Sequence, residues 1–194
     1  MASKEAFFAG LSPSSIEPTP MPEMTVATID DPPREHFIEV LERVGGSLGK
    51  GGDLGAVQQK VAELVAQNLQ VLSLVEGVEG NRDPSAVKDP YELKDIDFTI
   101  APAQWAVAEN GSVWIRGQDL VTRNAVFICE HLIATVDAER IVGTMSEAVS
   151  QVGKLGGGWG VFISGPSKTA DIEQALVMGA HGARSMTVYV LGGA

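Results

Sequence analysis

Two apolar runs without a polar face lie close together in the middle of the chain, at residues 126–128 and 131–136. Such runs are typical of strands that are covered on both sides of a sheet. Further along, Thr144 and Glu147 have the spacing of a capping box that opens a helix. Strands that alternate with helices predict a mostly parallel sheet, because parallel neighbours need crossover connections. We therefore expect a three-layer α/β/α fold with helices on both faces of the sheet.

Other local patterns predict the remaining elements. Apolar residues recur at helical spacing from residue 34 to residue 44, and Asp53 is a suitable N-cap for a second helix that leads into a strand at residues 69–75. The turn Glu109-Asn110-Gly111 separates two apolar runs, and Asn-Gly tolerates the positive φ of tight hairpins. This hairpin would make the sheet mixed.

The first 34 residues differ in composition from the rest of the chain. They contain six prolines, interspersed with serine and threonine, and such a stretch cannot form long regular structure. We interpret residues 1–34 as a proline-rich N-terminal arm. Residues 35–194 have the size of one domain.

Composition excludes several classes of function. With 14 basic and 25 acidic residues the formal charge is −11, which disfavours binding to nucleic acid or to an anionic membrane. No apolar run approaches the ~20 residues that span a bilayer, and the first thirty residues lack the pattern of a signal peptide, so we expect a cytoplasmic location. The single cysteine, Cys129, is interpreted as a small core residue. It excludes an internal disulfide and any cluster or zinc site built from cysteines of this chain, so a redox centre would belong to a partner.

The strongest candidate site is the segment from residue 164 to residue 171, which follows the buried run 159–163. We predict a helix after it, with Ile172, Ala175 and Leu176 buried. Small, hydroxyl-bearing and basic residues between a strand end and a helix start suit a carboxylate or phosphate. A capped helix, with Thr169 as N-cap, explains the same residues. The segment is not a P-loop, because Pro-Ser stands where Gly-Lys should continue. Its candidate ligand residues are Ser164, Gly165, Ser167, Lys168, Thr169 and Asp171.

A second candidate is the hairpin turn itself. Glu109 at a strand end could act as a nucleophile or general base, although a solvated hairpin turn explains it equally well. His181 lies in a glycine-containing loop, where a backbone can approach a ligand closely. His36, His131 and His181 show no metal-ligand spacing, and we expect no metal site. The additional candidate ligand residues are Asn110, Gly111, Ser112 and His181.

These segments together resemble the LUD family, of the lactate utilisation protein C type. The resemblance rests on residues 160–173 and 179–182, reinforced by residues 108–112 and 130–133, and it covers residues 35–194. It implies a sheet of the sugar-isomerase and CoA-transferase superfamily. It also implies a role beside two iron–sulfur proteins, lactate utilisation proteins A and B, in the oxidation of L-lactate to pyruvate. No catalytic residue follows from the resemblance.

Three hypotheses of function remain. In the first, the chain is an accessory protein that binds a small carboxylate, phosphate or partner in a groove at the strand ends, and the clusters belong to its partners. In the second, it is a CoA-transferase-like or nucleotide-dependent enzyme that uses Glu109. In the third, it is a scaffold that binds no ligand.

Overall fold

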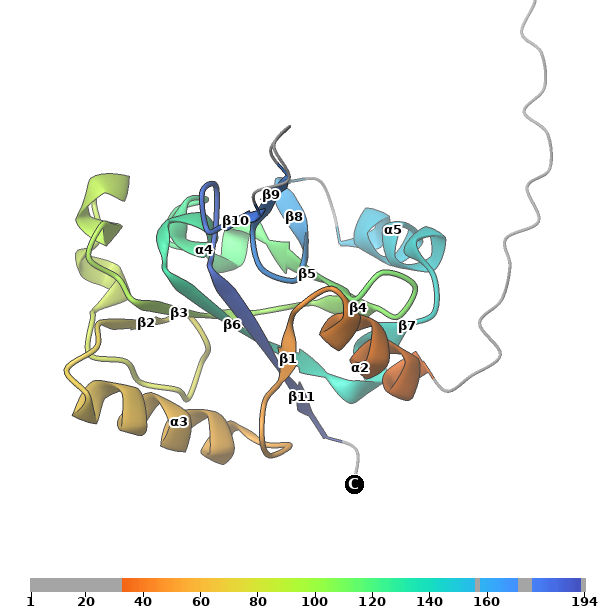
Figure 1. Ribbon diagram of the computed structural model, residues 1–194, viewed down its shortest axis with the longest axis horizontal. Helices are drawn as coiled ribbons and strands as arrows, with labels where there is room; N and C mark the ends of the chain where they lie inside the picture. The colour runs from red at the N-terminus through yellow and green to blue at the C-terminus, as the bar shows by residue number, and fades with distance from the viewer. Residues whose placement is uncertain (1–32, 156–157, 171–175, 193–194) are drawn as a thin grey trace, which may run out of the picture.

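A computed structural model describes residues 33–155, 158–170 and 176–192 (Figure 1). The helices are Pro33–Arg43 (α2), Leu54–Ala66 (α3), Ala125–Ile128 (α4) and Met145–Lys154 (α5), with 3-10 turns at Pro84–Ala86, Pro90–Leu93, Gly117–Asp119 and Ala138–Arg140. The strands are Ser47–Leu48 (β1), Val71–Ser73 (β2), Phe98–Pro102 (β3), Trp105–Val107 (β4), Ser112–Arg116 (β5), His131–Asp137 (β6), Ile141–Val142 (β7), Gly160–Ser164 (β8), Lys168–Ala170 (β9), Leu176–Met178 (β10) and Ser185–Leu191 (β11).

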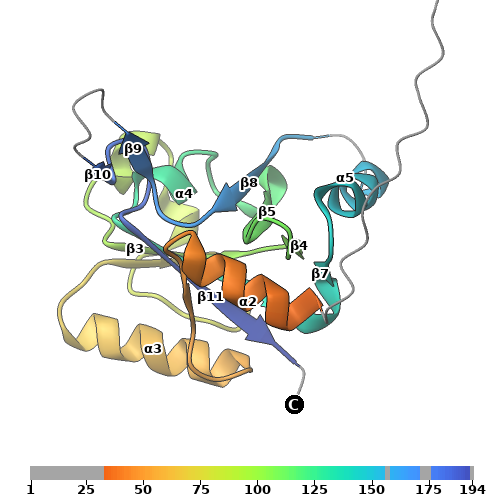
Figure 2. The ribbon, with the colours of Figure 1, turned by 45° about the vertical axis from the view of Figure 1, so that its right-hand side comes forward.

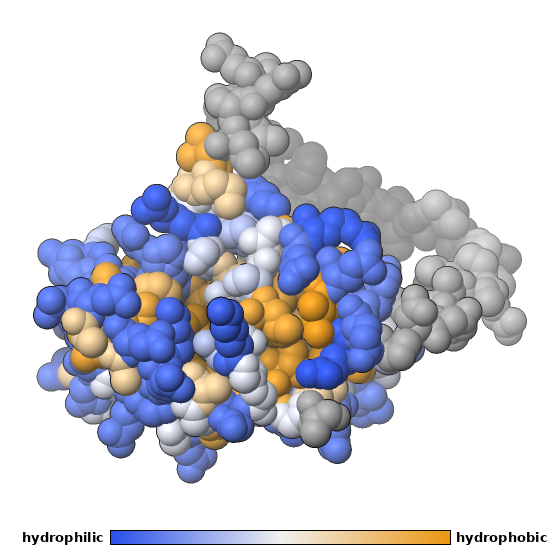
Figure 3. All heavy atoms as spheres, turned by 60° about the horizontal axis from the view of Figure 1, so that its bottom comes forward, coloured by the Kyte–Doolittle hydropathy of each residue, from blue (hydrophilic) through white to orange (hydrophobic). Residues whose placement is uncertain are grey.

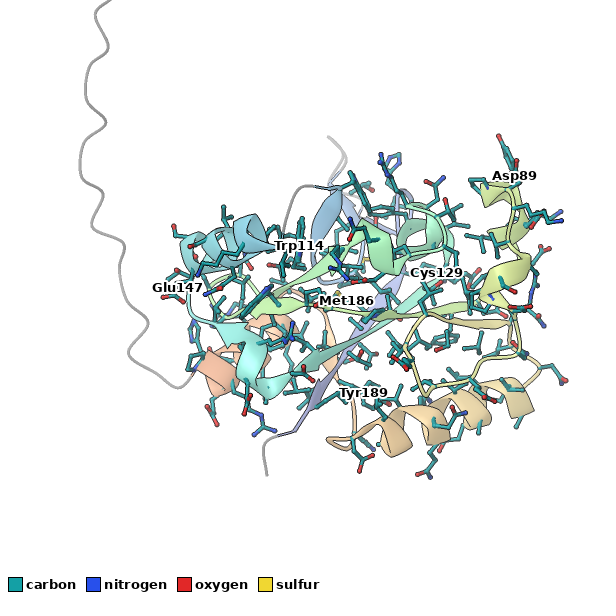
Figure 4. The ribbon with its side chains drawn as sticks, turned by 180° about the vertical axis from the view of Figure 1, so that it is seen from behind. Asp89, Trp114, Cys129, Glu147, Met186 and Tyr189 are labelled. Atoms are coloured by element: carbon teal, nitrogen blue, oxygen red, sulfur yellow. The ribbon has the colours of Figure 1, made fainter. Side chains whose placement is uncertain are left out.

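The central sheet has five parallel strands in the order β1-β11-β6-β3-β2. Side chains of its strands point alternately to its two faces. Ile133 and Tyr189 pack on α3, whereas Leu132 and Met186 face the opposite core, and Figure 4 shows Tyr189 and Met186 on the two sides of the sheet. Burial on both faces explains why β6 has no polar side, and the predicted strand is confirmed.

A smaller sheet, in the order β7-β4-β5-β8, lies with α2 over the face of the central sheet that α3 leaves free (Figure 2). The β4–β5 hairpin is antiparallel, as predicted, but it belongs to this second sheet and not to the central one. The three layers are therefore α3, the central sheet, and the second sheet with α2. The mostly parallel α/β fold expected from the sequence is confirmed.

Two helix starts follow their predicted caps. The Asp53 side chain accepts a hydrogen bond from the Ala56 N–H at 2.8 Å and caps α3. Thr144 and Glu147 form the predicted capping box of α5, in which the Thr144 hydroxyl accepts from the Glu147 N–H at 3.3 Å. Helix α2 begins at Pro33, a residue with favourable φ for a first helical position. The rest of the predicted arm, residues 1–32, lies outside the described residues.

The prediction of a strand at residues 126–128 is wrong. These residues belong to α4, in which the Phe127 and Ile128 N–H groups both donate to the Asn124 carbonyl at 2.9 Å. Phe127 and Ile128 are 37% and 36% exposed, so this run is not covered on two sides. Three residues are too few to distinguish the period of a strand from that of a helix.

The prediction of a helix after residue 169 is also wrong where the structure describes the chain, at residues 170 and 176–178, which are in strands. Strands β9 and β10 pair with each other antiparallel, with Thr169 opposite Val177. The Thr169 hydroxyl donates to the Val177 carbonyl at 3.2 Å instead of capping a helix. Thr and Val are both β-branched and favour strands. Asp171, Ile172 and Ala175 lie outside the described residues.

In the described part of the chain, no helix is long and apolar enough to cross a membrane. The face shown in Figure 3 is hydrophilic along both sides, with a hydrophobic area between them. Partial exposure of apolar side chains is usual, because a protein has too little polar surface to cover its whole exterior.

Candidate functional site

The structure brings together the two segments that the sequence singled out. Strands β5 and β8 pair antiparallel, with Ser112 opposite Ser164. The Ser164 hydroxyl donates to the carbonyl oxygen of Asn110 at 2.7 Å. The hairpin turn and the loop after β8 are therefore neighbours.

The polar groups of the turn stabilise the turn itself. Asn110 Oδ1 accepts hydrogen bonds from the backbone N–H and the hydroxyl of Ser112, at 3.0 and 2.6 Å. Gly111 has a φ of 65°, and a Cβ there would lie 2.9 Å from the backbone nitrogen of Leu41 in α2. Ser112 is only 1% exposed. These three residues therefore form hydrogen bonds within the turn or pack against α2. They line none of the cavities described below.

Glu109 is exposed, and its carboxylate is bound to the start of a helix. Its Oε2 accepts a hydrogen bond from the Met145 N–H, the first residue of α5, at 2.7 Å. A carboxylate is favourable at this position because helix N-termini carry unsatisfied N–H groups and partial positive charge. This contact accounts for Glu109 as a link between the hairpin turn and α5.

Lys168 likewise binds a protein group. Its Nζ donates to the carbonyl oxygen of Val44, the residue that follows α2, at 2.5 Å. A cation at this position compensates the free carbonyls at the end of a helix. Gly165 lies against the same residue, since a Cβ on Gly165 would be 2.6 Å from the Val44 oxygen. The loop after β8 is thereby held against the end of α2.

A cavity of about 230 Å³ lies beside this loop, and four of the predicted ligand residues line it: Ser164, Gly165, Ser167 and His181. We call it the β8 slot. Lys168 and Thr169 do not line it. Its remaining lining residues, which the sequence analysis missed, are Val126, Phe127, Leu132, Val161, Phe162, Ile163, Pro166, Gly182, Ala183 and Met186.

The β8 slot lies at different ends of the strands of the two sheets. Leu132 and Met186 are the second residues of β6 and β11, so the slot is at the amino ends of these parallel strands. The same slot lies at the carboxyl end of β8, where Ser164, Gly165 and Ser167 line it, because β8 belongs to the second sheet and not to the central one. A wider cavity of about 550 Å³ does lie at the carboxyl ends of β6 and β11, but it contains none of the predicted ligand residues.

The slot runs along the outer edge of β8. Successive strand residues point to opposite faces, so residues 161–164 can all line one cavity only if the cavity lies beside the strand. The Gly117 N–H donates to the Trp159 carbonyl at 2.8 Å, so these two residues form a hydrogen-bonded pair between the strands. From Trp159 onward, the backbone groups of successive residues point alternately toward β5 and away from it. The N–H and C=O groups of Gly160, Phe162 and Ser164 therefore point away from β5. Within the described residues, β5 is the only strand paired with β8.

Cys129 and His131 have structural surroundings. Cys129 is 2% exposed, as expected of a small core residue, and burial raises the pKa of its thiol. His131 stacks on Phe98 with ring centroids 4.6 Å apart, and its Nδ1 lies 2.7 Å from the Ser185 hydroxyl. This supports the interpretation of His131 as a structural histidine. Among residues 33–155, 158–170 and 176–192, no three metal-ligating side chains lie together.

These features define an α/β protein with a small, mostly apolar slot at the open edge of a strand. The model of the LUD domain matches residues 90–191, which is more than half of the chain. The chain therefore belongs to the LUD domain family.

Comparisons with individual proteins agree with this assignment. The chain is 31% identical over 107 residues to lactate utilization protein C of Shouchella clausii (strain KSM-K16), covering 53% of this chain and 46% of that protein. It is 34% identical over 95 residues to lactate utilization protein C 1 of Bacillus mycoides (strain KBAB4), covering 46% and 41%. The matches thus span less than half the length of these relatives.

A solved structure supports the fold. The crystal structure of a DUF162 family protein from Deinococcus radiodurans superposes with a TM-score of 0.62 at 19% identity, over 82% of this chain and 96% of that one. At this identity the similarity shows the α/β fold alone.

Proposed function

We propose that this chain is an accessory protein of lactate utilisation that binds a small carboxylate in the β8 slot. The name of its relatives supports the pathway. The observation that carries the proposal is the slot itself, in which the polar residues Ser164, Ser167 and His181 adjoin apolar lining residues. Ligand sites commonly combine an apolar lining with a few polar groups that orient the ligand.

Within this proposal the chain binds the carboxylate and presents it to partner proteins, and the partner proteins transfer the electrons. Its single cysteine cannot hold an iron–sulfur cluster, so the clusters would belong to lactate utilisation proteins A and B. We propose that the three proteins act together in the cytoplasm in the oxidation of L-lactate to pyruvate. The Ser167 hydroxyl makes no hydrogen bond to another described residue and is available to a carboxylate.

The alternative of a CoA-transferase-like enzyme has less support. The hydrogen bond from the Met145 N–H to Glu109 Oε2 already has a structural role at the start of α5, since it links the hairpin turn to this helix. Glu109 also does not line the β8 slot. Both observations favour the accessory role.

The proposal is tested in the native cells during growth on L-lactate. The tagged chain is recovered from these cells, and the eluate is assayed for iron–sulfur proteins and for lactate oxidation. We expect both to be present with the wild-type chain. Replacement of the chromosomal gene by Ser167→Ala or His181→Ala should slow growth on lactate, whereas Ser150→Ala, on the exposed side of α5, should not. Recovery of the chain alone, with normal growth after its deletion, would contradict the proposal.

A further inference from the structure

The size of the β8 slot exceeds what lactate requires. An apolar cavity of about 150 Å³ is sufficient to bind benzene. The slot has about 230 Å³ and therefore has room for a group of six carbons together with a polar head. Lactate offers only a methyl group to the apolar lining and would leave most of the slot unfilled.

The inner wall of the slot is built to hold an apolar group. Val126, Leu132 and Met186 are each 1% exposed, and they come from α4, β6 and β11. Ala183, which is 7% exposed, lies beside them. Three separate elements thus form a buried apolar floor, and the apolar area that a ligand removes from water belongs to Phe127, which is 37% exposed, and to the part-buried Val161 and Ile163.

The polar groups of the slot suit one negative charge and not several. Among the described residues that line the slot, His181 alone has a basic side chain, because Lys168 is bound to the Val44 carbonyl and lies outside the lining. The other polar groups are neutral: the Ser167 hydroxyl and the outward backbone N–H groups of Phe162 and Ser164. Phosphates and CoA carry two or more charges and normally require arginine, lysine or a helix terminus.

We infer that the β8 slot selects a monocarboxylate whose apolar body has about four to seven carbons, such as a branched-chain or aromatic 2-hydroxy acid, in preference to lactate. The inference rests on the proposed function, in which the slot receives a small carboxylate. It adds the class of side chain that the carboxylate carries. The apolar body packs against Phe127 and Val161 above the buried floor, and the carboxylate lies near Ser167 and His181.

Calorimetric titration of the full chain tests this inference with four compounds. They are L-lactate, L-2-hydroxyisocaproate, L-phenyllactate and the neutral 3-phenylpropane-1,2-diol. We expect phenyllactate to bind with a Kd at least tenfold lower than that of lactate, and hydroxyisocaproate to lie between them. The diol should bind more weakly than phenyllactate, because it lacks the charge that the polar end receives.

Two variants locate the binding. Ala183→Leu fills the apolar end and should abolish the advantage of phenyllactate over lactate, whereas Ala62→Leu, on the exposed side of α3, should leave it unchanged. Ser167→Ala should weaken all three acids and leave the diol unaffected. If Ala183→Leu does not fold by circular dichroism, Val161→Trp fills the slot from the edge strand.

The outcomes separate this inference from the proposed function. Lactate binding as tightly as phenyllactate, or an advantage of phenyllactate that survives both slot-filling variants, would overturn the inference and leave the accessory role intact. Failure of all three acids to bind would overturn the ligand site itself. Recovery of iron–sulfur partners from cells is a separate measurement and would then still decide the role in lactate oxidation.

Discussion

Ser164 Oγ lies 2.7 Å from the carbonyl oxygen of Asn110, a residue 54 positions earlier in the chain. This hydrogen bond fastens the loop after β8 to the hairpin turn between β4 and β5. Both segments in turn lie against α2, through Gly111 at Leu41 and through Gly165 at Val44. The end of α2 therefore sets the position of the end of β8 and of the loop after it, which contribute Ser164 and Ser167 to the β8 slot.

Loss of the Ser164 hydroxyl should loosen this loop. Ser164→Ala removes one hydrogen bond to the Asn110 carbonyl, and we expect the free energy of unfolding to fall by about 0.5–1 kcal/mol. Urea denaturation measures the change. Ser150→Ala on α5 is the control and should be neutral or slightly stabilising, because alanine has the higher helix propensity. Equal effects of the two substitutions would mean that the hydrogen bond contributes nothing.

Gly111 should tolerate no side chain. Its φ of 65° is unfavourable for other residues, and a Cβ would lie 2.9 Å from the Leu41 nitrogen. Gly111→Ala should lower the free energy of unfolding by about 1–3 kcal/mol. Gly153→Ala is a matched control, because Gly153 lies in α5 with nothing within 4 Å of its missing Cβ. That substitution should stabilise the protein by about 0.5–1 kcal/mol, and thermal unfolding distinguishes the two signs.

Lys168 should contribute to the stability of the protein and not to its affinity for a carboxylate. Lys168→Met retains most of the stem but removes the hydrogen bond to the Val44 carbonyl, and we expect a loss of about 0.5–1 kcal/mol of stability. Lys94→Met, at an exposed position, should be neutral. The affinity for a carboxylate should be the same in both variants. A tenfold weaker affinity in Lys168→Met alone would show that Lys168 reaches the ligand after all.

The stability of the protein should decline in alkaline solution. Burial raises the pKa of the Cys129 thiol above its ordinary value of 9.0, so the folded protein keeps a proton that the unfolded chain loses. Stability from this group is therefore complete below about pH 9 and is lost as the pH rises above it. Burial, with the nearby Glu63 charge, also raises the pKa of Tyr189 above its ordinary value of 10.0. The contribution of Tyr189 to stability is therefore also lost as the pH rises above about 10.

Urea midpoints measured from pH 7.5 to 10.5 test this expectation. Cys129→Ala should be less stable than wild type at pH 7.5, since it leaves a small cavity, but it should lose stability less steeply above pH 9. Parallel curves for the two proteins would contradict a role of the thiol in the alkaline decline.

Glu109 should form no covalent intermediate. With acyl-CoA present, hydroxylamine or borohydride should leave Glu109 unmodified, because Glu109 lies outside the β8 slot and its Oε2 accepts the Met145 N–H as part of the start of α5. Peptide mass spectrometry detects an adduct if one forms, and its presence would favour the enzyme hypothesis. Glu109→Gln should lower stability by about 0.3–1 kcal/mol through loss of the charge at the start of α5.

Local signals in the sequence determined many of the elements correctly. The apolar run at β6 predicts a strand because burial on both faces permits no polar side. The Asn-Gly turn predicts the β4–β5 hairpin, and the capping residues Asp53 and Thr144 predict the starts of α3 and α5. In each case a few neighbouring residues carry the whole signal, because the favoured backbone conformation depends on contacts within one turn or one strand.

Only the tertiary structure decided how these elements combine. The sequence by itself allowed a helix after Thr169, whereas the described residues on either side, in β9 and β10, pair antiparallel with Thr169 opposite Val177. Pairing of β8 with β5 placed the slot at the amino ends of β6 and β11, opposite to the end that a parallel sheet alone suggests. Lys168 and Glu109 were candidate site residues until their partners, Val44 and Met145, were known. Such contacts join residues far apart in the chain, and whether a polar side chain is free for a ligand depends on them.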